Sequence, residues 1–96
     1  MKLGLVADRH DMKVVDFIFK GKLEDPTKIK DMDKYCLRFF SDIKTKLKAK
    51  EKIEIYVTGC TPALICAINS CKILGLDVVL WHFNSFTKNY FKQEVI

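Results

Sequence analysis

The stretch Ile53-Glu54-Ile55-Tyr56-Val57-Thr58-Gly59-Cys60-Thr61-Pro62 decides the fold of this 96-residue chain. Residues 53–58 are rich in β-branched and aromatic side chains, which predicts a strand. After a two-residue turn, Thr61 offers a hydroxyl at the N-cap of a helix, and Pro62 suits the first helical position. The helix over residues 62–74 is expected to end at Gly75, because glycine accepts the left-handed conformation after a helix.

Upstream of this stretch, the sequence predicts a first strand and an amphipathic helix. Residues 2–7 form a short apolar run, and residues 14–19 are either an edge strand or an ordered loop between turn signals. The helix begins near Asp31, with Asp31 or Asp33 as its cap. Its apolar stripe, at spacings of three and four residues, consists of Met32, Cys36, Phe39, Phe40, Ile43 and Leu47.

Downstream, residues 77–83 predict a third strand, and residues 84–89 form a turn into an antiparallel partner at 90–95. Strands that alternate with helices pair in parallel through right-handed crossovers. We therefore predict one domain over residues 1–96. Its fold class is α/β: a small Rossmann-like, mainly parallel sheet of βαβαβ order with a C-terminal antiparallel hairpin strand. Four to five strands are expected, covered by helices on both faces or on one.

Composition limits the class of protein. Seventeen Lys+Arg against twelve Asp+Glu give a net charge of +5, which favours an anionic partner such as a nucleotide or a nucleic acid. For the lysines of the helix a solvated surface is the preferred interpretation, since a run of charges is usually solvated. No apolar run reaches the roughly 20 residues of a membrane-spanning helix. The four cysteines and two histidines lack the spacing of a structural zinc site, so we expect no metal and no cofactor. Free thiols indicate a reducing, cytoplasmic location.

The helix over residues 62–74 predicts an assembly. Apolar side chains surround it almost completely, and only Asn69, Ser70 and Lys72 within it are polar. A helix that is apolar all round is buried on more than one side, whereas one small sheet covers a single side. A homodimer through the Pro62–Leu74 helix is the economical solution. The alternative is that the hairpin or the loop over residues 20–30 covers the second side.

Polar residues gather where the predicted strands end. Ligands of parallel sheets bind beyond the carboxyl ends of the strands, and these ends carry residues 8–11, 58–61 and 81–85. Both histidines and one of the two arginines lie there. Lys88 of the hairpin belongs either to a lid over the site or to an edge strand protected by lysines. The expected site consists of Asp8, Arg9, His10, Thr58, Gly59, Cys60, Thr61, His82, Asn84 and Lys88.

The turn that enters the second helix can hold a phosphate. Gly59 lets the backbone approach a ligand, and the first N–H groups of the helix face it at the positive end of the helix dipole. The expected donors are the amides of Cys60, Thr61 and Ala63 and the hydroxyls of Thr58 and Thr61. A tight turn with a good cap explains the same residues without a ligand. Arg9 and the two histidines on the same rim favour the anion site.

Chemistry at this rim would fall to three side chains. His10 and His82 can act as general acid and base, and Arg9 can stabilise the added charge. Each histidine can equally fix a turn. Cys60 lies near a helix N-terminus, which lowers a thiol pKa, but no arginine follows it as a phosphatase loop requires. We interpret Cys60 as a packing or ligand-lining residue.

The segment Ile55-Tyr56-Val57-Thr58-Gly59-Cys60-Thr61, a strand ending in Thr-Gly-x-Thr before a helix, resembles the signature loop of CARF domains, the CRISPR-associated Rossmann folds. The resemblance implies a homodimer that binds a cyclic oligoadenylate across the subunit interface. Ring nucleases of this family cleave that ligand without a metal, using a ribose 2′-hydroxyl. Cys60 stands where the family often has a second glycine, and Pro62 where it often has a lysine that would meet the phosphate.

The expected function is therefore binding of a cyclic oligonucleotide second messenger, with sequestration or slow cleavage. The resemblance implies a regulator or inhibitor of CRISPR-type antiviral signalling, like stand-alone proteins of CRISPR loci and phages. One alternative is a basic nucleic-acid-binding accessory that uses Lys44, Lys46 and Lys48. Its aromatic neighbours belong to the core stripe, which argues against it. The other is an assembly module whose apolar helix binds a host protein.

Overall fold

The structure, a computed structural model, describes residues 1–7, 16–20, 25, 27–58 and 60–95. The chain is α/β, as the sequence predicts. Its elements, in chain order, are β1 (Lys2–Val6), β2 (Phe17–Phe19), α1 (Ile29–Lys44), β3 (Ile53–Tyr56), α2 (Thr61–Ile73), β4 (Val78–Asn84) and β5 (Asn89–Val95). Of the two readings of residues 14–19, the strand is the correct one, over its last three residues.

The five strands form one mixed, mostly parallel sheet in the order β2-β1-β3-β4-β5. The three pairings among β2, β1, β3 and β4 are parallel, and β5 runs antiparallel to β4. The predicted βαβαβ order is incomplete, because β2 stands between β1 and α1 in the chain. Bonds from the Gly4 N–H to the Asp16 oxygen (2.9 Å) and from the Ala7 N–H to the Phe19 oxygen (3.0 Å) hold it at the edge beside β1.

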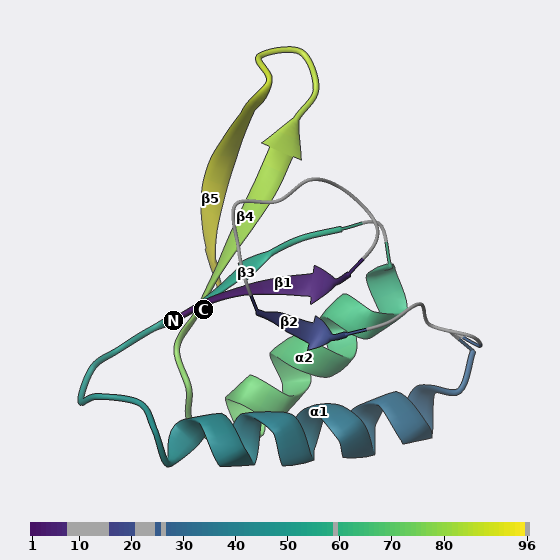
Figure 1. The fold of residues 1–96 in the computed structure, drawn as a ribbon, viewed down its shortest axis with the longest axis vertical. Helices are drawn as coiled ribbons and strands as arrows, with labels where there is room; N and C mark the ends of the chain where they lie inside the picture. Colours follow the sequence, from purple (N-terminus) through teal and green to yellow (C-terminus); the bar gives the residue numbers. More distant parts are fainter. Residues whose placement is uncertain (8–15, 21–24, 26, 59, 96) are drawn as a thin grey trace.

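Both helices lie on the same side of the sheet (Figure 1), so the prediction of a sheet covered on one face is the correct one. The chain passes from β2 through α1 to β3, and from β3 through α2 to β4, and both crossovers advance in the same direction across the sheet. Two crossovers of one hand that advance in one direction leave both helices on one face. The core lies between, formed chiefly by Leu3, Leu5, Ile18, Phe40, Ile53, Ile55, Cys66 and Cys71.

Helix α1 is the amphipathic helix that the spacing predicts. Met32, Cys36, Phe40 and Ile43 are its buried residues. The predicted caps are wrong: the helix begins at Ile29 after Lys28, and no side chain caps it. Asp31 lies inside the first turn, because the helical bonds begin with the Met32 N–H, which donates to the Lys28 oxygen (3.1 Å).

Helix α2 ends as predicted, since Gly75 follows it with a φ of +71°. Its start differs, because Cys60 occupies the N-cap and Thr61 is already helical. Lys44 of α1 donates from Nζ to the Leu74 oxygen (2.8 Å), where a cation suits the negative end of the helix dipole. That bond gives one lysine of the proposed nucleic-acid surface a structural role.

The C-terminal hairpin extends beyond the rest of the sheet (Figure 1). Strand β3 pairs with β4 only from Val78 to Trp81, whereas β5 pairs with β4 over its whole length. The outer half of β4 therefore has only β5 beside it. In the described part of the chain, no helix is long and apolar enough to cross a membrane.

Candidate functional site

Only part of the predicted rim falls within the described residues. Asp8, Arg9, His10 and Gly59 lie outside them, so their predicted roles stay predictions. The described members are Thr58, Cys60 and Thr61 at the start of α2, and His82, Asn84 and Lys88 in the hairpin. Among the described residues, no hydrogen bond or ion pair joins the first group to the second.

Thr58 is the unusual residue of the first group. It lies two positions beyond the end of β3 and is 4% exposed. Its Oγ1 is buried and has no hydrogen-bond partner among the described residues. Nearly all buried polar atoms of folded proteins are paired, because an unpaired one costs about 1–3 kcal/mol. The Thr58 hydroxyl therefore keeps an unused donor next to the start of α2.

The first turn of α2 supplies fewer donors than the sequence predicts. The Cys60 N–H bonds to the Thr58 oxygen (2.8 Å), so this amide is not free. Pro62 has no N–H. The Cys60 oxygen accepts the Leu64 N–H (3.1 Å), and no side chain caps the helix. Within the described residues, the N–H groups of Thr61 and Ala63 have no acceptor, and they lie at the positive end of the helix dipole.

The cysteines are packing residues of the helical layer. All four are free and buried. Burial raises the pKa of Cys36, Cys66 and Cys71 to about 12 in each case, so these thiols stay protonated at neutral pH. The Cys66 thiol also lies 3.9 Å from the Ile29 oxygen. Cys60 is 6% exposed and belongs to the core cluster.

The hairpin residues of the predicted site bond within the hairpin itself. A ring nitrogen of His82 (Nε2) lies 2.9 Å from the side-chain oxygen of Gln93, and the ring stacks on Phe91 with centroids 5.3 Å apart. Asn84 accepts the Phe86 N–H (2.9 Å) and thereby shapes the turn. Lys88 is in that turn with a φ of +59°. The edge strand, one of the two alternatives predicted around Lys88, is present as β5, and Lys88 lies in the turn just before it.

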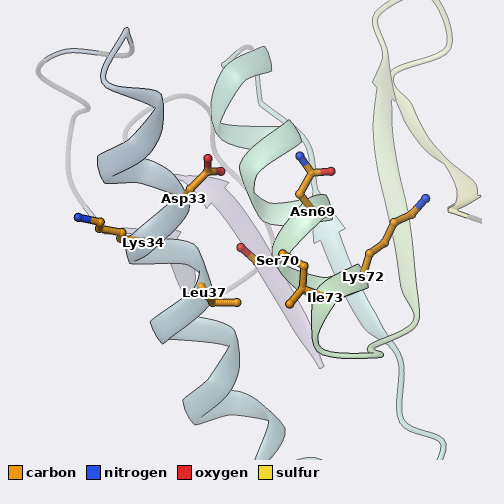
Figure 2. A pocket seen from close by; sticks show the side chains of 7 residues that line it. All are labelled: Asp33, Lys34, Leu37, Asn69, Ser70, Lys72 and Ile73. Atoms are coloured by element: carbon orange, nitrogen blue, oxygen red, sulfur yellow. The ribbon is translucent and has the colours of Figure 1, made fainter.

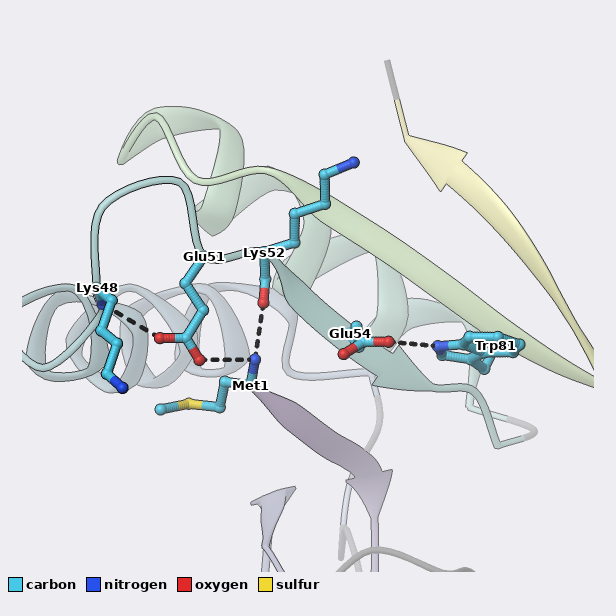
Figure 3. Close-up of polar contacts among 6 residues, drawn as sticks. All are labelled: Met1, Lys48, Glu51, Lys52, Glu54 and Trp81. Atoms are coloured by element: carbon cyan, nitrogen blue, oxygen red, sulfur yellow. Dashed lines mark hydrogen bonds and ion pairs between the residues drawn. The ribbon is translucent and has the colours of Figure 1, made fainter.

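The sequence analysis missed a cluster of four aromatic rings on the sheet face away from the helices. Tyr56 stacks on Trp81 (centroids 6.0 Å) and meets Tyr90 edge to face (5.2 Å), and Tyr90 meets Phe83 in the same way (5.3 Å). The Trp81 indole N–H donates to Glu54 Oε1 (3.1 Å), as Figure 3 shows. The predicted turn over residues 84–89 places Phe83 directly opposite Tyr90. This cross-strand aromatic pair could therefore have been predicted from the sequence.

A second polar network surrounds the amino group of Met1 (Figure 3). Its residues Met1, Glu51 and Lys52 line one pocket with Glu54 and Trp81 of the same face. The Met1 amino group contacts Glu51 Oε2 (3.0 Å) and the Lys52 oxygen (2.9 Å). The Lys48 N–H also bonds to Glu51 (3.1 Å), and these donors lower the pKa of that carboxyl. Among the described residues, no group of three His, Cys, Asp or Glu side chains could hold a metal ion.

Comparison with known proteins gave no match: no family model, no curated protein and no solved structure is significantly similar to this chain. The function therefore has to be argued from the geometry of the chain itself.

Proposed function

We propose that this protein, with a Rossmann-like arrangement of its parallel strands, binds a phosphate-bearing nucleotide at the start of α2. The observation that supports the proposal most is the buried Thr58 hydroxyl, which lies beside the N–H groups of Thr61 and Ala63. None of these three donors has an acceptor among the residues that the structure describes. A phosphate oxygen accepts hydrogen bonds from donors of both kinds and suits the positive end of the helix.

The ligand class that we propose is a cyclic oligonucleotide, which the resemblance of residues 55–61 to the CARF signature loop implies. In this proposal Arg9 and His10 contribute cations or proton transfer, and His82 in the hairpin contributes from the other side. The protein would sequester the ligand or slowly cleave it, and thereby regulate a signalling pathway of the CRISPR type. In this proposal Cys60 packs against the core or lines the site, and it takes no part in catalysis.

We also propose that the active form is a homodimer through α2. Within that helix Ile65 and Ile73 are 52% and 73% exposed. Leu37 of α1 is also exposed and lines the same groove as Ile73. Figure 2 shows the groove of ≈ 470 Å³ between the two helices, lined by Leu37 and Ile73 with Ser70 at its floor. Asp33 and Lys72 line the same groove, and opposite charges on one patch suit a two-fold interface, where the patch meets its own copy.

The ligand is tested by incubating the protein with cyclic di-, tri-, tetra- and hexa-adenylate, with calorimetry for binding and chromatography for cleavage. We expect one ring size to bind, and Thr58→Val to weaken its binding at least tenfold. Valine has nearly the same shape and removes only the hydroxyl. Thr87→Val, in the exposed hairpin turn, is the matched control and should bind normally. Failure of all four rings to bind or be cleaved would refute the cyclic ligand.

The dimer is tested separately by light scattering after size exclusion. Ile65→Lys should give a monomer, while Ala49→Lys, which adds the same charge at an exposed site outside α2, should leave the dimer intact. A monomeric parent protein at high concentration would contradict the proposal. A host protein bound through α2 would predict the same loss of partner binding in Ile65→Lys but no effect of Thr58→Val.

A further inference from the structure

The four-ring cluster of Tyr56, Trp81, Phe83 and Tyr90 lies on the sheet face away from the helices. Successive side chains of a strand point to opposite faces of the sheet. The side chains of β3 and β4 that point toward the helices belong to the core, namely Ile53, Ile55, Val78 and Leu80. Tyr56 and Trp81 therefore point to the other face. No described helix lies on that side of the sheet (Figure 1). Phe83 is 49% exposed, so the cluster offers ring surface to a partner.

Charge divides this face into two ends. Residues 81–93 contain Lys88 and Lys92 and no carboxylate, and Lys92 stands directly opposite Trp81 in the register. The carboxylates of the face lie on the inner side of Trp81: Glu54 accepts the Trp81 indole N–H, and Glu94 lies 3.5 Å from Lys52. Glu54 and Glu94 line one pocket together with Trp81 and Lys92. The hairpin beyond Trp81, which carries Phe83 and Tyr90, is therefore the cationic part of the face.

We propose that this face, over the hairpin and the end of β3, binds single-stranded nucleic acid. Unpaired bases stack on aromatic rings whatever their sequence, while lysines beside the rings meet the phosphates. The cluster consists of aromatic rings, with no exposed Leu, Ile or Met among them, and the tyrosine hydroxyls and indole suit a wet, polar partner better than an apolar protein surface. Double-stranded nucleic acid keeps its bases stacked inside, so the duplex should bind weakly.

Apart from Lys88 in the hairpin turn, this surface shares no residue with the predicted nucleotide site. His82 and Phe91 lie on the opposite face of the hairpin, because they pair with each other in the register and alternate with Trp81 and Tyr90. It is also separate from the α1 lysines that the sequence suggested for nucleic acid. The inference therefore does not depend on the proposed function, and either can fail alone.

The experiment uses the whole chain and a labelled single-stranded oligo(dT) of about 12 nucleotides. Trp81 is the only tryptophan of the chain, so its fluorescence reports on the cluster directly. We expect quenching of that fluorescence on binding, together with a rise in the anisotropy of the label. Phe83→Ala and Tyr90→Ala should each weaken binding by about five- to a hundredfold. Lys92→Gln should lower the slope of log K against log salt by about 0.7.

Phe91→Ala is the matched control, because Phe91 is 52% exposed on the other face of the same hairpin, against 49% for Phe83. It should leave the affinity unchanged. Circular dichroism confirms that each variant folds. Equal losses in Phe83→Ala and Phe91→Ala, binding without quenching, equal affinity for duplex, or no binding at all would each overturn the proposal. So would a change of Trp81 fluorescence with protein concentration alone, since that would assign the face to a second copy.

Discussion

The two faces of the sheet differ in the burial and the polarity of their side chains. The face under α1 and α2 carries aliphatic residues such as Leu5, Ile55 and Leu80, all within the core and nearly inaccessible. The other face carries Tyr56, Trp81 and polar partners, which remain partly accessible. The same strands supply both faces, because successive side chains alternate. Stability therefore depends mainly on one face, and the other is available for binding.

The largest loss of stability should come from truncating a phenylalanine of the covered face, and the same truncation on the uncovered face should cost much less. Phe40 of α1 is fully buried and Phe83 is half exposed. Phe40→Ala should lower the free energy of unfolding by about 3–5 kcal/mol. Phe83→Ala should cost about 1 kcal/mol or less, chiefly its contact with Tyr90. Urea denaturation measures both, and similar losses would show that the hairpin face belongs to the core.

The second-largest effect is expected at alkaline pH, which should lower the free energy of unfolding through the buried thiols of the covered face. Burial raises the pKa of Cys36 and Cys71 from 9.0 to about 12. The folded chain therefore holds these protons more tightly than the unfolded chain does. Their contribution to stability is complete below about pH 9 and is lost as the pH rises toward 12. Urea midpoints at pH 8 to 10 should fall, and Cys71→Ala should reduce the slope.

Reagents for thiols give an independent check of the same burial. The native protein should leave Cys36 and Cys71 unmodified at pH 8, and both should react at once in denaturant. Mass spectrometry identifies the modified residues. Rapid modification of either residue in the native protein would mean that the helical layer opens more readily than its packing suggests.

A smaller effect is expected where α1 holds the edge strand. The Tyr35 hydroxyl donates to the Ile18 oxygen of β2 (2.5 Å), and the Tyr35 ring stacks on Phe19. Tyr35→Phe keeps the ring and removes the bond, so it should cost about 1 kcal/mol. Hydrogen exchange should show faster exchange for the Ala7 N–H, which bonds to β2, and no change in β4.

The smallest effect is expected on the uncovered face. Glu54→Ala removes the acceptor of the Trp81 indole N–H, but water can replace it because Trp81 is only half buried. The change should cost less than about 1 kcal/mol and shift the Trp81 emission. A cost like that of Phe40→Ala would contradict the division between the two faces.

The candidate site could be predicted only in its local part. The turn from β3 into α2 follows from Thr58, Gly59 and Pro62, whose conformational preferences act over a few residues. The sequence could not show which amides and hydroxyls form hydrogen bonds. The Cys60 N–H bonds to the Thr58 oxygen, whereas the Thr58 hydroxyl has no partner in the described part of the chain. The aromatic cluster needed the register of three strands, which brings Tyr56 and Tyr90 together although β4 lies between their strands.

By itself, the sequence determined the elements of this protein, since side-chain periodicity and the residues at helix ends are local properties of the chain. The spacing of apolar residues predicted the buried stripe of α1, Gly75 predicted the end of α2, and the turn residues predicted the return of β4 into β5. Only the tertiary structure decided that β2 joins the sheet beside β1 and that both helices cover one face. Those choices depend on contacts between segments far apart in the chain, whose order and direction no local pattern encodes.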